Sequence, residues 1–122
     1  MGMAVVKTFA GQGVSAPEVS VEIHLANGLP AFQLVGMAET SVKEARERVR
    51  SALINSGFEF PAKRITVNLA PADLPKEGSH FDLAIALGIM IEMGVLNQGL
   101  VENYFVLGEL ALDGSIAGGG GI

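Results

Sequence analysis

Hydrophobic and polar residues alternate along two stretches of the chain, residues 17–26 and 64–69. A period of two places successive side chains on opposite faces of a strand, so each stretch is predicted to form a half-buried β-strand. Residues 3–10 are also typical of a strand. Residues 31–35, a further strand candidate, follow Asn27-Gly28, a pair that favours a tight hairpin turn. We therefore expect residues 31–35 to return beside residues 17–26.

A helical period replaces this alternation in residues 41–56. Apolar side chains there recur every three to four residues along one stripe, which predicts an amphipathic helix. Ser41 and Glu44 have the spacing of a capping box at its start. Glu44 also precedes Arg48 by one helical turn, which favours an ion pair within the helix. Gly57 is expected to end it.

Residues 81–93 are apolar on nearly every side, so a helix there must be covered all round. Its length of about 13 residues is too short to span a bilayer, which needs about 20. We therefore expect a central core helix. Ser79 is predicted as its N-cap, Asp82 as a carboxylate in its first turn, and Gly94 as its end.

The C-terminal part predicts one more strand at residues 104–112 and a hairpin turn at Asp113-Gly114. Residues 115–117 would begin the returning strand, and residues 118–121 are all glycine. We expect a single domain over residues 1–117 and a glycine-rich end at 118–122, with the chain forming part of a longer protein. The order β-β-β-α-β-α-β predicts an α+β fold, a mixed sheet with two main helices on one face.

Composition narrows the function. The chain has 8 lysines and arginines against 13 acidic residues, a net charge of −5, so the domain as a whole is not a nucleic-acid-binding polycation. The absence of cysteine excludes disulfides and thiolate metal sites, and fits a cytoplasmic protein. No apolar stretch is long enough for a membrane span. His24 has no second ligand at metal spacing and is predicted to be solvated.

Positive charge is nevertheless concentrated on the predicted helix 41–56. Lys43, Arg46 and Arg50 are spaced i, i+3, i+7 and share one stripe. This stripe can serve as a surface for nucleic acid or an acidic partner. It can equally be a solvated face whose charge the neighbouring Glu47 partly cancels. Both interpretations stay open at this point.

Several motifs together resemble the N-terminal domain of the ComM/YifB family, the magnesium-chelatase-like AAA+ proteins. They lie in residues 28–30, 42–50, 55–58, 64–79, 81–83 and 107–114. The resemblance implies a ribosomal protein S5 domain 2-like fold, shared with the proteolytic domain of Lon. It also implies that the domain precedes an AAA+ ATPase module, which would use ATP and Mg²⁺, in a protein associated with DNA branch migration during natural competence.

Two departures from the family pattern qualify that expectation. The chain contains no Gly-x-x-x-x-Gly-Lys-Ser/Thr motif, so it cannot bind and hydrolyse ATP by the P-loop route. We expect no cofactor in this part of the protein. The arginine that the family usually places after the last hairpin turn is replaced by Ala117 and glycines.

The likeness to Lon raises the question of peptidase activity. Lon-type domains use a serine nucleophile and a desolvated lysine that accepts its proton. The serine loop of Lon and the loop of this chain share a Pro-Lys-acid-Gly sequence, here Pro75-Lys76-Glu77-Gly78. When the two loops are aligned on it, the position of the Lon nucleophile holds His80, and Ser79 falls one residue early. One residue rotates a side chain by about 100° at a helix start. Ser79 and Lys76 are therefore weak catalytic candidates, and Lys76 is predicted to be a solvated loop residue.

Three hypotheses follow. The first is a non-catalytic accessory domain that helps its own AAA+ module assemble into a ring, and guides DNA. The candidate contacts to DNA or a partner are Lys43, Arg46, Arg50, Arg64 and Lys76. The second is a Ser79/Lys76 peptidase. The third is a pure oligomerisation module that uses the exposed apolar edge left by the truncated last strand. Independently of these hypotheses, we expect the full-length protein to form a homo-oligomer.

Overall fold

The computed structural model describes residues 3–10, 17–74, 76 and 78–117 of the protein. The predicted glycine-rich end at 118–122 lies outside these residues. The elements in chain order are β1 (Ala4–Phe9), β2 (Glu18–Ala26), β3 (Ala31–Val35), α1 (Glu39–Asn55), β4 (Arg64–Ala70), α2 (Asp82–Glu92), the 3₁₀ helix η1 (Gln98–Leu100), β5 (Glu109–Leu110) and β6 (Ile116–Ala117). The predicted α+β class is confirmed.

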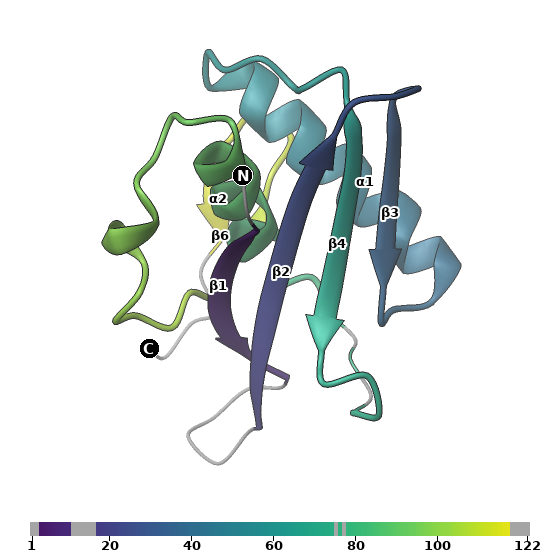
Figure 1. Ribbon diagram of the computed structural model, residues 1–122, viewed down its shortest axis with the longest axis vertical. Coiled ribbons are helices and arrows are strands. Elements are labelled where there is room, and N and C mark those ends of the chain that lie inside the picture. The colour runs from purple at the N-terminus through teal and green to yellow at the C-terminus, as the bar shows by residue number, and fades with distance from the viewer. Residues whose placement is uncertain (1–2, 11–16, 75, 77, 118–122) are drawn as a thin grey trace.

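A four-stranded mixed sheet carries both α-helices on one face, so the domain has two layers (Figure 1). The alternation predicted for β4 is confirmed, since Ile65, Val67 and Leu69 are buried on the side of the sheet that faces the helices. The intervening positions line the open face, where Asn68 donates a hydrogen bond to Glu22 at 2.9 Å. The core therefore lies between the sheet and the helices, and the other face of the sheet is polar.

The position of β3 differs from the sequence prediction. The strand order is β1-β2-β4-β3, so β4 lies between β2 and β3, and the predicted hairpin of residues 17–26 with 31–35 is wrong. β4 runs antiparallel to β2 and parallel to β3. Pro30 lacks the amide that a ladder beside β2 would require just after the turn. The helix α1 instead carries the chain from β3 to a parallel neighbour, as in a βαβ unit.

The start of α1 also differs. The helix begins at Glu39, its N-cap is Ala38, and no side chain caps it, so the predicted capping box of Ser41 and Glu44 is wrong. Ala38 has an extended backbone and its carbonyl accepts the Val42 amide at 3.0 Å. The N-cap therefore lies three residues before the predicted one. Its end at Gly57, where φ is +92°, is confirmed.

The helix α2 is the centre of the packing, as predicted. It packs against β1, β2, α1 and β5, and Ala84, Ile85 and Ile89 are fully buried. Gly88 permits a close approach to the sheet, because a Cβ built there would lie 2.0 Å from Ile23 Cδ1. Gly94 follows the helix with φ +80°, which confirms the predicted end. No helix among the described residues is long and apolar enough to cross a membrane.

The C-terminal strand is much shorter than predicted. Of residues 104–112, only Glu109–Leu110 form β5, and Phe105 makes a single bridge to Lys7 of β1. The hairpin turn at Asp113-Gly114 is confirmed: β5 pairs with β6, and the Ser115 amide donates to the Asp113 carboxylate at 2.9 Å. The hairpin forms a small second sheet, and its strands do not extend the main one.

Candidate functional site

A pocket of about 250 Å³ opens where α1 passes the start of β3 and the segment before β4. We call it the cationic pocket. It is lined by Pro30, Ala31, Phe32, Arg46, Arg50, Ile54, Phe60, Pro61, Ala62 and Lys63. Because β3 and β4 are parallel, their first residues lie at the same end of the sheet, where Ala31 is level with Arg64. This topology brings Lys63 beside the wall that α1 contributes.

Arg46 and Arg50 come from the basic stripe that the sequence predicts on this helix. Both side chains are exposed, and they stand one turn apart on the same side of α1, about 6 Å along its axis. Ile54 continues the same wall one turn later. The inner side of the helix, with Ala45, Val49 and Ala52, is buried in the core. The amphipathic pattern of α1 therefore directs these two arginines to the pocket.

Lys63 belongs to the pocket and was not among the residues that sequence reasoning selected. Its Nζ donates a hydrogen bond to Asn27 Oδ1 at 2.8 Å, so the ammonium group lies at this end of the sheet. The sequence carries a signal for it, since Lys63 directly precedes β4. This position predicts a place in the pocket only when β3 is known to be parallel to β4.

All the charged residues that line the pocket are positive. Three of the eight lysines and arginines of the chain line it, and no aspartate or glutamate does. The local field is therefore positive although the chain as a whole is acidic. None of the ion pairs among the described residues includes these three cations, so their guanidinium and ammonium groups are suited to bind phosphate or carboxylate oxygens.

The other predicted contact residues lie elsewhere. Lys43 is exposed on α1 one turn before Arg46 but does not line the pocket. Arg64 is exposed and donates a weak hydrogen bond to Gln33 Oε1 at 3.5 Å. Lys76 is only 6% exposed, so its predicted solvation is wrong; its Nζ donates to the carbonyl of Pro71. The structure thus brings together two of the five predicted cations.

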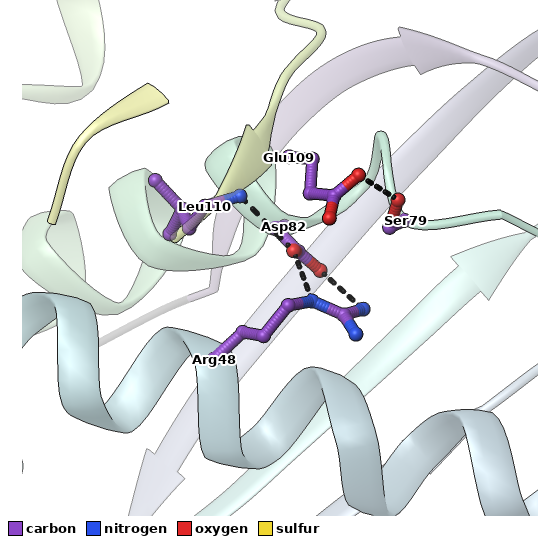
Figure 2. A network of polar contacts seen from close by, with 5 residues as sticks. All are labelled: Arg48, Ser79, Asp82, Glu109 and Leu110. Atoms are coloured by element: carbon purple, nitrogen blue, oxygen red, sulfur yellow. Dashed lines mark hydrogen bonds and ion pairs between the residues drawn. The ribbon is translucent and has the colours of Figure 1, made fainter. Parts of the chain in front are cut away.

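The serine predicted to cap α2 does not cap it. The helix begins at Asp82, Phe81 occupies the N-cap position, and no side chain caps it. Ser79 Oγ instead donates to Glu109 Oε1 at 2.6 Å, as Figure 2 shows. Only the main chain of Ser79 serves the helix start, because its carbonyl accepts the Asp82 amide at 3.1 Å. The serine hydroxyl is therefore engaged by a residue 30 positions away.

Arg48 and Asp82 form a second polar site, on the inner side of α1. Arg48 Nε lies 2.6 Å from Asp82 Oδ2, and its Nη2 lies 3.1 Å from Oδ1. The same carboxylate accepts the Leu110 amide at 3.1 Å, so three elements meet at one side chain (Figure 2). Arg48 thus pairs with Asp82, and the predicted pair with Glu44 is wrong. The tertiary contact is bidentate and shielded from solvent, which an exposed pair on the helix surface is not.

Burial dominates the electrostatics of this second site. Asp82 is only 1% exposed, and desolvation raises the pKa of its carboxyl above the usual value. The hydrogen bonds from Arg48 and from the Leu110 amide oppose that rise in pKa. In turn, the hydrogen bond to Asp82 raises the pKa of Arg48. The Arg48–Asp82 pair therefore links α1 to α2, and the Leu110 amide links the same carboxylate to β5.

The two histidines have separate environments. His80 Nε2 lies 2.8 Å from the carbonyl oxygen of Phe9, to which it donates, and its ring packs against Phe81. His24 is exposed and its Nδ1 lies 4.0 Å from Glu92 Oε1. Across residues 3–10, 17–74, 76 and 78–117, no group of three or more histidines and acidic residues is arranged to hold a metal ion.

The comparisons with known proteins agree with the motifs. Residues 21–122 match the profile of a family described as subunit ChlI of Mg-chelatase. The chain is 55% identical over 118 residues to the protein YifB of Salmonella typhimurium, and 52% identical over 118 residues to YifB of Escherichia coli. These matches cover 97% of the chain and 23% of each relative.

A third relative is named as a competence protein. The competence protein ComM of Haemophilus influenzae is 53% identical over 122 residues, which is all of this chain and 24% of ComM. The chain therefore spans about a quarter of the length of the curated relatives that it matches.

Proposed function

This chain belongs to the family of subunit ChlI of Mg-chelatase, and we propose that it is a non-catalytic accessory domain that binds DNA through the cationic pocket. We place it as the N-terminal, S5 domain 2-like part of a ComM-type AAA+ protein in the cytoplasm. The ATP and Mg²⁺ of such a protein would belong to its ATPase module. The name of the relative ComM supports a role in competence, where transforming DNA is the molecule to be handled.

The composition of the pocket carries the proposal. Arg46, Arg50 and Lys63 line it with no carboxylate among them. A phosphate backbone is the repeating anion that such a cluster fits, and neutralising it releases counterions, which gives binding energy and makes it depend on salt. The −5 charge of the whole chain opposes binding elsewhere on the surface, so DNA is directed to this end of the sheet.

The state of the two catalytic candidates supports a non-catalytic role. The Ser79 hydroxyl donates a hydrogen bond to Glu109, and Lys76 Nζ donates one to the carbonyl of Pro71. A Ser-Lys peptidase needs the lysine amine within hydrogen-bond reach of the serine hydroxyl, so that the lysine can accept its proton. Within the described residues, no hydrogen bond joins Ser79 to Lys76. The peptidase hypothesis is the alternative that this arrangement disfavours.

The experiment is a DNA-binding titration by fluorescence anisotropy at several salt concentrations. Arg46→Gln/Arg50→Gln removes two of the pocket's cations while keeping long polar side chains. We expect affinity to fall by about 10-fold or more and the slope of log K against log salt to become shallower by about 1 to 2, because fewer counterions are released.

The matched control is Lys7→Gln, which removes one positive charge from β1, where Lys7 forms an exposed ion pair with Glu18 at 3.6 Å. It is compared with the single variant Arg50→Gln, which changes the net charge equally. Affinity should be retained in the first and reduced in the second. Equal affinity in both, or a salt slope unaffected by the double variant, would contradict the proposal.

A further inference from the structure

The cationic pocket combines charge with an apolar aromatic wall, and this second property is not needed to hold a phosphate. Phe32 and Phe60 line it together with Ile54 and two prolines. Both phenylalanines are only half-buried. The described residues contain two aromatic contacts, Phe9 with Phe105 and His80 with Phe81, so neither pocket ring is covered by another ring.

The volume limits what can enter. About 250 Å³ is below the roughly 300–1,000 Å³ typical of sites that enclose a whole drug-sized ligand. It suits one planar ring system whose attached anionic group stays at the cationic side. A duplex keeps its bases stacked and paired, so it has no free base to place against the phenylalanines. A single strand has such bases, and aromatic side chains bind them by stacking.

The cations are placed to hold the backbone of the same strand. Arg46 and Arg50 stand one helical turn apart on α1, so they can contact phosphates at separate points along it. Lys63 is held by Asn27 at the end of the sheet, on the segment that also supplies Phe60 and Pro61. Stacking and phosphate contacts are therefore available to one nucleotide at the same time.

We infer that the cationic pocket captures one unpaired nucleotide of a single strand, with its base against Phe32 and Phe60 and its phosphates at Arg46, Arg50 and Lys63. This inference rests on the proposed function and adds to it a preference for single-stranded over duplex nucleic acid. The preference comes from the aromatic wall, whereas DNA binding in general comes from the cations.

Four probes test it by anisotropy or competition: a 12-nucleotide single strand, the duplex of the same sequence, the same strand with abasic sites in place of bases, and free thymidine monophosphate. We expect the single strand to bind about 10-fold or more tightly than the duplex and the abasic strand. Free thymidine monophosphate should compete only at far higher concentration, because it supplies fewer phosphates.

Phe60→Leu removes the ring while keeping an apolar side chain, and Phe58→Leu is the matched control, since Phe58 is also half-buried but does not line the pocket. Phe60→Leu should weaken single-strand binding by about 5-fold or more and leave duplex and abasic binding unchanged. Phe58→Leu should change none of these affinities, and circular dichroism of both variants checks that they are folded.

The outcomes separate the two proposals. If all DNA probes bind equally and Arg46→Gln/Arg50→Gln still weakens them, nucleotide capture is overturned and DNA binding through the cations stands. If no DNA probe binds, both proposals fail. If thymidine monophosphate binds as tightly as the single strand, the pocket is a mononucleotide site and the single-strand inference is wrong.

Discussion

The two sides of α1 carry arginines with opposite surroundings. Arg48 turns inward, where Asp82 binds it in a bidentate pair at 2.6 and 3.1 Å. Arg46 and Arg50, two positions away on either side, are exposed and line the cationic pocket. No ion pair of the described residues includes either of them. The same residue type therefore serves structure on one side and is available for a ligand on the other.

This contrast separates a charge that stabilises the fold from a charge that is available to a ligand. A buried carboxylate must be paired, because leaving it alone costs more than the pair contributes. An exposed arginine without a carboxylate contributes little to stability and keeps its hydrogen-bonding groups for other molecules. Burial and partner, not residue type, distinguish the two roles on this helix.

The largest expected effect is on the inner side. Arg48→Ala leaves the Asp82 carboxylate buried without its cation, and we expect the free energy of unfolding to fall by about 3–5 kcal/mol in urea denaturation. The control is Lys7→Ala, which removes an ion pair whose side chains are about half exposed and should cost no more than about 1 kcal/mol. Similar losses in the two variants would erase the contrast between buried and exposed charge.

The second expectation concerns pH. Arg48 opposes the rise that burial causes in the Asp82 pKa, so in Arg48→Ala that folded-state pKa should rise further above its unfolded value. A carboxyl with a raised folded-state pKa takes up a proton on folding. The free energy of unfolding of the variant therefore rises, relative to that of the unchanged protein, as pH falls. The deficit of Arg48→Ala should therefore shrink from about pH 7 to about pH 4. A deficit that stays constant, or grows on acidification, would show that lost packing rather than buried charge causes it.

The smallest effect is expected on the outer side. Arg46→Gln/Arg50→Gln should change the free energy of unfolding by no more than about 0.5 kcal/mol, since exposed substitutions away from special features rarely do more. Thermal and urea unfolding of the double variant measure this directly. A loss above about 1 kcal/mol would show that these arginines stabilise the fold. The contrast with Arg48 would then no longer support their availability for a ligand.

Local patterns in the sequence predicted most of the elements but not how they pair. The buried helix 81–93 and the alternating strand 64–69 are present almost as expected, because period and capping glycines act within a few residues. The place of β3 was missed because Asn27-Gly28 favours a turn whatever strand follows it. The sheet order depends on whether β3 pairs with β2 or with β4. The connection through α1 allows β3 to pair with β4 in parallel, and a local turn signal carries no information about that pairing.

The candidate site was predicted in part for the same reason. Arg46 and Arg50 could be found because they lie on one helix. Lys63, Phe32 and Phe60 could not, since they join the pocket through the parallel register of β3 with β4. Ser79 was misassigned because capping is a local preference, whereas its actual partner, Glu109, is remote in sequence.

The hydrogen bond from the Leu110 amide to Asp82 has a consequence for synthesis on the ribosome. The main sheet and both α-helices are complete in sequence by Glu92, yet the innermost acid receives its backbone donor 28 residues after its own position. Until residue 110 has left the exit tunnel, the Asp82 carboxylate lacks this backbone donor and, among the described residues, has Arg48 as its one hydrogen-bonding side chain. The small hairpin thus completes the hydrogen bonds of Asp82 after the main sheet and both α-helices have been synthesised.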